Sequence, residues 1–159
     1  MQGRPLVTAS IRGFWLKTER DTPVVGSMSM SFTLPKEVLV VEDEPFVRMV
    51  AADALTERGI MAWEAGDADE ALHVLAEHPN IGLVFTDVNM PGEMDGLGLA
   101  HEVNRLRPDV SLIVTSGAVS VADEELPDSG TFLSKPYPTR KLVQIVEEKL
   151  DGPFGETVG

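Results

Sequence analysis

The sequence predicts an α/β protein: a doubly wound sheet of five parallel strands with helices on both faces. Two observations carry this prediction. Between residues 36 and 150, short apolar runs alternate five times with segments whose apolar residues recur at helical spacing. Polar residues suited to chemistry follow directly after several of these apolar runs. Such βα units need right-handed crossovers, which bury a parallel sheet between two layers of helices.

Length and composition bound the class of protein. The 159-residue chain is 43% apolar and 25% charged, which is typical of a globular protein with one core. It contains no cysteine, which excludes a disulfide framework and a thiolate metal site. No apolar run approaches the roughly 18 residues of a membrane span. We therefore expect a cytoplasmic protein with no membrane partner.

The chain is strongly acidic, with a formal net charge of −13. This charge argues against direct nucleic-acid binding, because phosphate backbones require a basic face. It is compatible with a partner that carries basic groups, or with a cation bound between clustered carboxylates.

Three segments are expected along the chain. Residues 1–35 are weakly basic and lack periodicity, so we expect a disordered extension; the alternative is a docking segment around Phe14 and Trp15. This segment lacks the apolar core of a signal peptide. Residues 36–150 are expected to form the folded domain. Residues 151–159 are short and Gly-rich, and we expect a flexible tail.

The strands are predicted from short runs rich in apolar and β-branched residues. They are expected at Val38–Val41, Ile60–Glu64, Ile81–Thr86, Val110–Thr115 and Thr131–Ser134. The third run is followed by Asp87 and then by Met90-Pro91-Gly92, which cannot continue a strand. An aspartate is therefore expected where a buried strand opens into a loop.

The helices are predicted from apolar residues at helical spacing, with start and stop signals. The first helix is expected to begin at Pro45 and to end before Gly59. The other three are expected to span Ala68–Glu77, Gly96–Leu106 and Pro138–Leu150. Asp67 and Asp95 are suited to cap the second and third helices. The acidic segment 118–126 supports at most a marginal helix.

Polar residues follow the carboxyl ends of four predicted strands, the edge at which open α/β sheets bind ligands. They are Glu42 and Asp43 after the first strand, Asp87 after the third, Ser116 after the fourth and Lys135 after the fifth. If the strand order is 2-1-3-4-5, the first and third strands are neighbours. The two acidic groups then face each other across one crevice.

Carboxylates about 4 Å apart repel by about 4 kcal/mol at an effective dielectric near 20. They stay ionised together when a cation lies between them, and Mg²⁺ fits best because it accepts carboxylates, waters and phosphate oxygens. With the ammonium of Lys135 and the hydroxyl of Ser116, this set matches the demands of phosphoryl transfer.

Four motifs in this order resemble the receiver domain of bacterial two-component response regulators. They are Glu42-Asp43-Glu44-Pro45, Asp87 with Asn89-Met90-Pro91-Gly92 and Met94-Asp95-Gly96, Thr115-Ser116-Gly117, and Lys135-Pro136-Tyr137. The resemblance covers residues 37–150 and is closest to single-domain, chemotaxis-type receivers. It implies a flavodoxin-like fold with strand order 2-1-3-4-5.

The resemblance implies a role for each site residue. Asp87 would accept a phosphoryl group from a phosphohistidine on a sensor histidine kinase or a histidine phosphotransfer protein. Asp43, Asp87 and the backbone carbonyl of Asn89 would bind Mg²⁺, with Glu42 acting through a bound water. Lys135 would pair with the phosphoryl oxygens.

Two further residues would form the switch of such a receiver. Ser116, at the end of the strand pattern beside the small Gly117, would supply the switch hydroxyl, and Phe132 would be the aromatic switch. The protein would then catalyse only its own phosphorylation and dephosphorylation, and would not be a conventional enzyme. Because no output domain follows Leu150, we expect its downstream effector in the phosphorelay to be a separate protein.

The sequence departs from the family pattern in two places. Glu42 replaces a commoner aspartate, a tolerable change for a residue that acts through water. The segment between Ser116 and Lys135 is shorter than in many receivers, so the family's fourth helix, and with it the usual output face, is expected to be reduced.

Alternatives remain for the function and for single residues. A Mg²⁺-dependent phosphohydrolase with an aspartyl-phosphate intermediate would use the same strand-end aspartate, but it wants a second aspartate where this chain has Asn89. A phosphorylation-independent adaptor would have no need to hold like charges together. Asp43 could be a solvated helix start, Lys135 a surface lysine, Ser116 a turn cap and Phe132 a core residue.

Overall fold

The computed structural model describes residues 35–127 and 130–158, with the side chains described as far as Asp151. The predicted disorder of residues 1–35, and the alternative of a docking segment at Phe14 and Trp15, therefore fall outside the described residues, apart from Pro35.

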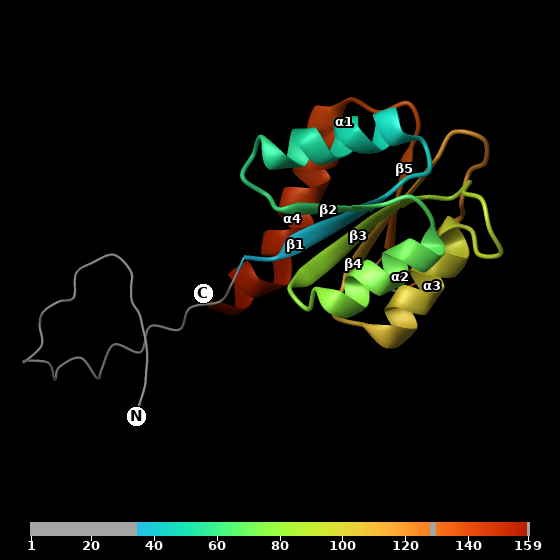
Figure 1. Ribbon diagram of the computed structural model, residues 1–159. Coiled ribbons are helices and arrows are strands. Elements are labelled where there is room, and N and C mark those ends of the chain that lie inside the picture. Colours follow the sequence, from blue (N-terminus) through green and yellow to red (C-terminus); the bar gives the residue numbers. More distant parts are fainter. Residues whose placement is uncertain (1–34, 128–129, 159) are drawn as a thin grey trace, which may run out of the picture. The chain divides into compact units, whose positions relative to one another are not determined.

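Five parallel strands form one sheet in the order β2-β1-β3-β4-β5, as predicted (Figure 1). The strands are β1 (Glu37–Val41), β2 (Ala62–Ala65), β3 (Ile81–Asp87), β4 (Ser111–Ser116) and β5 (Gly130–Ser134). β3 lies at the centre and all seven of its residues are buried. This burial explains why the third run is almost wholly apolar.

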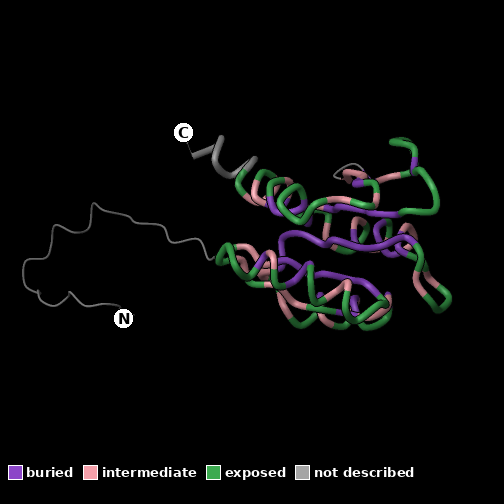
Figure 2. Tube along the Cα trace, turned by 90° about the horizontal axis from the view of Figure 1, so that it is seen from above, coloured by how far each residue is buried: buried purple, intermediate pink, exposed green. Residues whose placement is uncertain are grey.

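Helices cover both faces of the sheet (Figure 1). They are α1 (Pro45–Thr56), α2 (Ala68–Glu77), α3 (Gly96–Leu106) and α4 (Thr139–Val158). Buried residues of α1 and α4 form one apolar cluster with one face of the sheet, and those of α2 and α3 form a second cluster with the other. Figure 2 shows the buried strands between helices whose outer sides are exposed.

Alternation along the strands decides which cluster each side chain joins. In β3, Leu83 and Phe85 pack in the cluster of α1 and α4, whereas Val84 packs in the cluster of α2 and α3. Asp87 follows the same alternation and therefore belongs to the α1 and α4 side of the sheet.

The two predicted capping residues, Asp67 and Asp95, cap the amino-terminal ends of α2 and α3. The Asp67 side chain accepts a hydrogen bond from the Glu70 amide (2.8 Å), and the Asp95 side chain accepts one from the Gly98 amide (2.9 Å). Both caps satisfy amides that have no partner within the first helical turn. Gly59 follows the end of α1 with a φ of 81°, a conformation that favours glycine.

Most boundaries lie within one residue of the prediction, and two elements, β2 and α4, differ by more at one end. β2 begins at Ala62 and not at Ile60. Helix α4 begins at Thr139 and continues to Val158, beyond its predicted end at Leu150. The flexible tail expected over 151–159 stays a prediction. Gly and Pro lower helix propensity without always ending a helix, so Gly152 and Pro153 placed the predicted end too early.

The segment between β4 and β5 has little helical structure, as expected. Within its described part, residues 117–127, the only helical element is the single 3₁₀ turn η3 (Asp123–Glu125). The His101 ring contacts the Glu125 carbonyl oxygen through Nε2 (2.8 Å), which ties α3 to this turn.

None of the helices within the described residues has the length and apolarity that crossing a bilayer requires.

Candidate functional site

The sheet places two acidic residues side by side. Val41 pairs with Thr86 across β1 and β3, so the next residues along each chain, Glu42 and Asp87, meet at the carboxyl ends of the two central strands. The Glu42 amide donates to the Ala65 carbonyl of β2 (3.1 Å), which continues the ladder past the end of β1. Strand register therefore brings these carboxylates together.

Glu42, Asp43 and Asp87 form one acidic cluster. One carboxylate oxygen of each lies within 4.8 Å of the others, and this is the only such metal-type cluster among the described residues. Glu42 and Asp87 are each 5% exposed, whereas Asp43 is exposed. Two buried carboxylates and one open to solvent form a site that a cation can enter from the Asp43 side.

Lys135 places its ammonium against the two buried carboxylates. Its Nζ lies 3.4 Å from Glu42 Oε1 and 3.5 Å from Asp87 Oδ2. The Lys135 amide donates to the Ser116 carbonyl (3.0 Å), so β4 positions the lysine just beyond β5. The predicted convergence of residues 42, 43, 87 and 135 is therefore present in the structure.

One oxygen of Asp87 has no donor. Asp87 Oδ1 is the only buried side-chain polar atom, among the described residues, that lacks a hydrogen-bond partner. Buried acceptors are normally satisfied, and an ionised carboxylate has a strong need for positive charge. The carboxylate oxygens of this cluster therefore fit a hard divalent cation, which prefers oxygen ligands.

The electrostatics of the cluster follow from burial and like charge. Burial raises the pKa of Glu42; the hydrogen bond from the Glu44 amide (3.2 Å) and the charge of Lys135 oppose this shift, while Asp87 adds to it. A bound cation would offset the part of this shift that comes from repulsion between Glu42 and Asp87.

A family model of the response regulator receiver domain matches residues 38–147.

The chain belongs to the response regulator receiver family.

Known relatives agree with this membership. The response regulator receiver protein CpdR of Brucella abortus (strain 2308) is 33% identical over 118 residues, which cover 72% of this chain and 97% of CpdR. The sensor kinase CckA of the same strain is 37% identical over 139 residues, which cover 85% of this chain and only 14% of CckA. The crystal structure of the NtrX receiver domain from Brucella abortus superposes with a TM-score of 0.67 at 29% identity, covering 73% of this chain and 99% of that one. Receivers are signalling modules of two-component systems and not conventional enzymes.

Two hydroxyls lie at the end of β4 in this receiver, and they have different partners. Thr115 Oγ1 donates to the Leu133 carbonyl (2.6 Å), so its proton is used within the sheet. Ser116 Oγ accepts from the Val119 amide (3.3 Å), which is the contact that the turn-cap alternative predicts. Because that bond uses an acceptor lone pair, the Ser116 proton is still available to a new acceptor.

Phe132 and Asn89 lie at the margins of the receiver site. Phe132 is half-buried and packs against the cluster of α2 and α3, on the face opposite Asp87. This placement agrees with the core alternative and leaves the aromatic switch a prediction. Asn89 is exposed in the loop after β3, and the role of its carbonyl also stays a prediction.

Two residues beside the site, Tyr137 and Arg48, had no individual role in the sequence prediction. Tyr137 lies near the site: burial, and then the charges of Glu42 and Asp87, raise its pKa to about 12. Its ring meets Phe85 edge-on with centroids 5.9 Å apart. Arg48 of α1 donates from Nη1 to the Glu42 carbonyl (2.6 Å). A side chain that reaches a backbone oxygen leaves no pattern in the sequence, so only the structure could reveal it.

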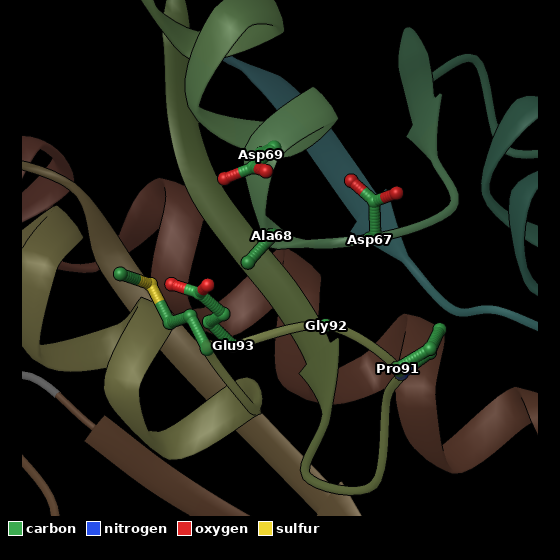
Figure 3. Close-up of a pocket in the computed structure, with 7 residues that line it drawn as sticks. Asp67, Ala68, Asp69, Pro91, Gly92 and Glu93 are labelled. Atoms are coloured by element: carbon green, nitrogen blue, oxygen red, sulfur yellow. The ribbon is translucent and has the colours of Figure 1, made fainter.

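Figure 3 shows a pocket elsewhere, between the start of α2 and the β3–α3 loop. Its volume is about 200 Å³, and it is lined by Asp67, Ala68, Asp69, Pro91, Gly92, Glu93 and Met94. No predicted site residue lines it, and one of its acids, Asp67, already caps α2.

Proposed function

We propose that this receiver accepts a phosphoryl group on Asp87 from a phosphohistidine of a sensor histidine kinase or a histidine phosphotransfer protein, and that phosphorylation switches its binding to a separate protein effector. The observation that carries the proposal is the state of the Asp87 carboxylate. One oxygen lies near the ammonium of Lys135, and the other is buried without a donor. The family membership and the likeness to the sensor kinase CckA support the kind of donor.

The proposal includes Mg²⁺ at the acidic cluster. Asp43, Asp87 and the carbonyl of Asn89 would hold the ion, which would neutralise charge on the phosphoryl oxygens. Glu42 would act through a water. This indirect role is supported by the partners that Glu42 already has, Lys135 on Oε1 and the Glu44 amide on Oε2.

The transfer itself requires little from the protein beyond position and charge. An oxygen of Asp87 attacks the phosphorus, the phosphorus–nitrogen bond breaks, and its electron pair returns to the imidazole, which takes up a proton. The charge that remains on the phosphoryl oxygens lies within reach of the Lys135 ammonium. The new acyl phosphate carries about −1.5 to −2 charges at neutral pH.

That charge is the signal for the switch. Ser116 retains its proton as a donor while Oγ accepts from Val119. Rotation of Ser116 toward a phosphoryl oxygen would release the Val119 amide and change the surface after β4. A bias of a few kcal/mol is enough to shift such a two-state equilibrium. Phe132 is the candidate for a coupled movement.

A cytoplasmic location belongs to the same proposal. The chain has no cysteine, which suits a reducing compartment, and its proposed donors carry a labile phosphohistidine that must reach Asp87 directly.

Incubation with Mg²⁺ and acetyl phosphate, followed by intact-mass spectrometry, tests the proposal. We expect one added phosphoryl group, which EDTA prevents. Asp87→Asn is the matched variant, since it keeps the shape of the side chain, and it should remain unlabelled. Turnover of diverse phosphate esters without a stable adduct would instead favour the phosphohydrolase.

A further inference from the structure

Arg48, at the start of α1, bridges the ends of β1 and β2. Its Nη1 donates to the Glu42 carbonyl oxygen (2.6 Å), and its Nε pairs with Glu64 Oε1 of β2 (3.2 Å). The side chain is only 21% exposed. A planar guanidinium held at two points has one orientation, so Arg48 is a rigid bracket behind the β1–α1 turn.

Gly66 leaves the space that this bracket occupies. A Cβ at position 66 would lie 3.3 Å from Arg48 Nη1 and 3.5 Å from Glu70 Oε1. Because the backbone there is not in the left-handed region, this glycine is explained by space and not by conformation. The guanidinium therefore fits a place formed by β2 and the start of α2.

The Glu42 carbonyl determines where Asp43 points. The peptide group between Glu42 and Asp43 is planar, so fixing its oxygen also fixes its nitrogen and the Asp43 Cα. The Glu42 amide is fixed as well, through the Ala65 carbonyl (3.1 Å). Asp43 is exposed, in contrast to Glu42 and Asp87, so the position of its carboxylate depends on this backbone more than on packing.

We propose that Arg48 is a positioning residue for the divalent cation: by holding the Glu42 carbonyl, it places the Asp43 carboxylate beside that of Asp87. Glu64 and Gly66 support it by orienting the guanidinium. The inference rests on the proposed function, since it concerns the cation of that same site.

The sign of the effect separates positioning from charge. Arg48 carries a positive charge close to the cluster, and like charges repel. If Arg48 acted on the cation through charge alone, Arg48→Gln would tighten cation binding. If it acts by positioning Asp43, the same variant weakens binding. Residues that orient metal ligands from outside change metal affinity by about 10- to 100-fold.

Mg²⁺ titration followed by amide NMR measures this affinity without any phosphorylation. We expect Arg48→Gln to weaken Mg²⁺ binding about 10-fold and to shift the Asp43 amide in the absence of metal. The matched control is Arg58→Gln, which removes the same charge near the other end of α1 and breaks an ion pair with Glu147 (3.0 Å). It should leave Mg²⁺ affinity unchanged, even if stability falls.

A second readout uses acetyl phosphate. Loss of positioning should raise the Mg²⁺ concentration that gives half the maximal labelling rate, while the rate at saturating Mg²⁺ approaches that of the wild type. A merely structural role would lower the melting temperature and leave the half-saturating Mg²⁺ concentration unchanged.

Arg48→Lys keeps the charge but loses the two-point contact, and it serves if Arg48→Gln does not fold. It should also weaken Mg²⁺ binding, though less than Arg48→Gln. An affinity equal to or above that of the wild type in the folded variants would overturn the inference alone. If the wild-type protein itself bound no Mg²⁺, the proposed function would fail first.

Discussion

The ammonium of Lys135 lies 3.4 Å from Glu42 Oε1, although the two residues are 93 positions apart in the chain. The same ammonium lies 3.5 Å from Asp87 Oδ2. Lys135 thus balances two buried carboxylates before any ligand arrives. A residue proposed to meet the phosphoryl group therefore also has a part in the stability of the unphosphorylated protein.

Lys135→Met should destabilise the protein. Removing one partner of a fully buried pair costs roughly 3–5 kcal/mol, but Lys135 is 27% exposed, so we expect about 2 kcal/mol. Urea unfolding in EDTA measures this loss. The matched control is Lys141→Met on α4, an exposed lysine whose replacement should change stability by less than about 0.5 kcal/mol. Equal effects of the two variants would contradict this account of Lys135.

Gly96→Ala should damage the end of β3. A Cβ at position 96 would lie 1.8 Å from the Asp87 carbonyl oxygen, a contact that backbone must move to relieve. We expect a loss of about 3 kcal/mol or more in the free energy of unfolding. Gly98→Ala in the same helix is the control, since its Cβ would meet side chains alone, the flexible Met94 at 3.0 Å and Asp95 Oδ1 at 3.5 Å. Its effect should stay within about 1 kcal/mol. An equally small loss of stability in Gly96→Ala would refute the close contact between position 96 and the Asp87 carbonyl.

Thr115 and Ser116 should respond differently to loss of the hydroxyl. Thr115→Val removes a buried donor to the Leu133 carbonyl, so it should cost about 1–2 kcal/mol of stability. Ser116→Ala should cost less, because the lost bond from Val119 is long at 3.3 Å. After labelling with acetyl phosphate, Ser116→Ala should keep the Val119 amide resonance near its unphosphorylated position. A normal phosphorylation-induced shift in that variant would remove Ser116 as the switch.

Tyr137 provides a pH-dependent signal, since it is the only tyrosine in the chain. Its pKa is raised to about 12, first by burial and then by Glu42 and Asp87. The phenolate absorbance should therefore rise with a midpoint near 12 in the folded protein, and the midpoint should fall in Glu42→Gln. A midpoint near 10, the value for an exposed tyrosine, would show that the ring is not buried beside these acids.

The same shift has a defined sign for stability. The unfolded chain releases the Tyr137 proton near pH 10, whereas the folded protein retains it to about 12. The unfolded state then binds fewer protons, so the free energy of unfolding falls as pH rises from about 10 toward 12. In Tyr137→Phe this part of the fall should disappear, as urea titrations across that range would show.

The sequence predicted what depends on local patterns. Strands such as β3 are apolar because they are buried on both faces, and Asp67 and Asp95 cap helices through bonds to residues three positions away. To place Asp87 at the carboxyl edge of the sheet, the predicted end of β3 and the predicted topology were enough. The predicted end of α4 was wrong because Gly152 and Pro153 lower helix propensity without always ending a helix.

Contacts between distant side chains needed the structure. The sequence placed Lys135 and Glu42 at one edge of the sheet, but it assigned Lys135 to the phosphoryl group and Glu42 to a water. Their mutual contact depends on register and on rotamers that no pattern encodes. The same holds for Arg48, whose partner is a backbone oxygen.

The 3₁₀ turn η3, with the bond between His101 and the Glu125 carbonyl, bears on how far a signal at Ser116 travels. A rigid helix would transmit a displacement along its whole length. A single turn that is hydrogen-bonded to α3 should instead confine the movement to the residues between Ser116 and Glu125. An effector of this protein would then sense a small mechanical change close to the phosphorylated aspartate, and its footprint should include the rim of the acidic site itself.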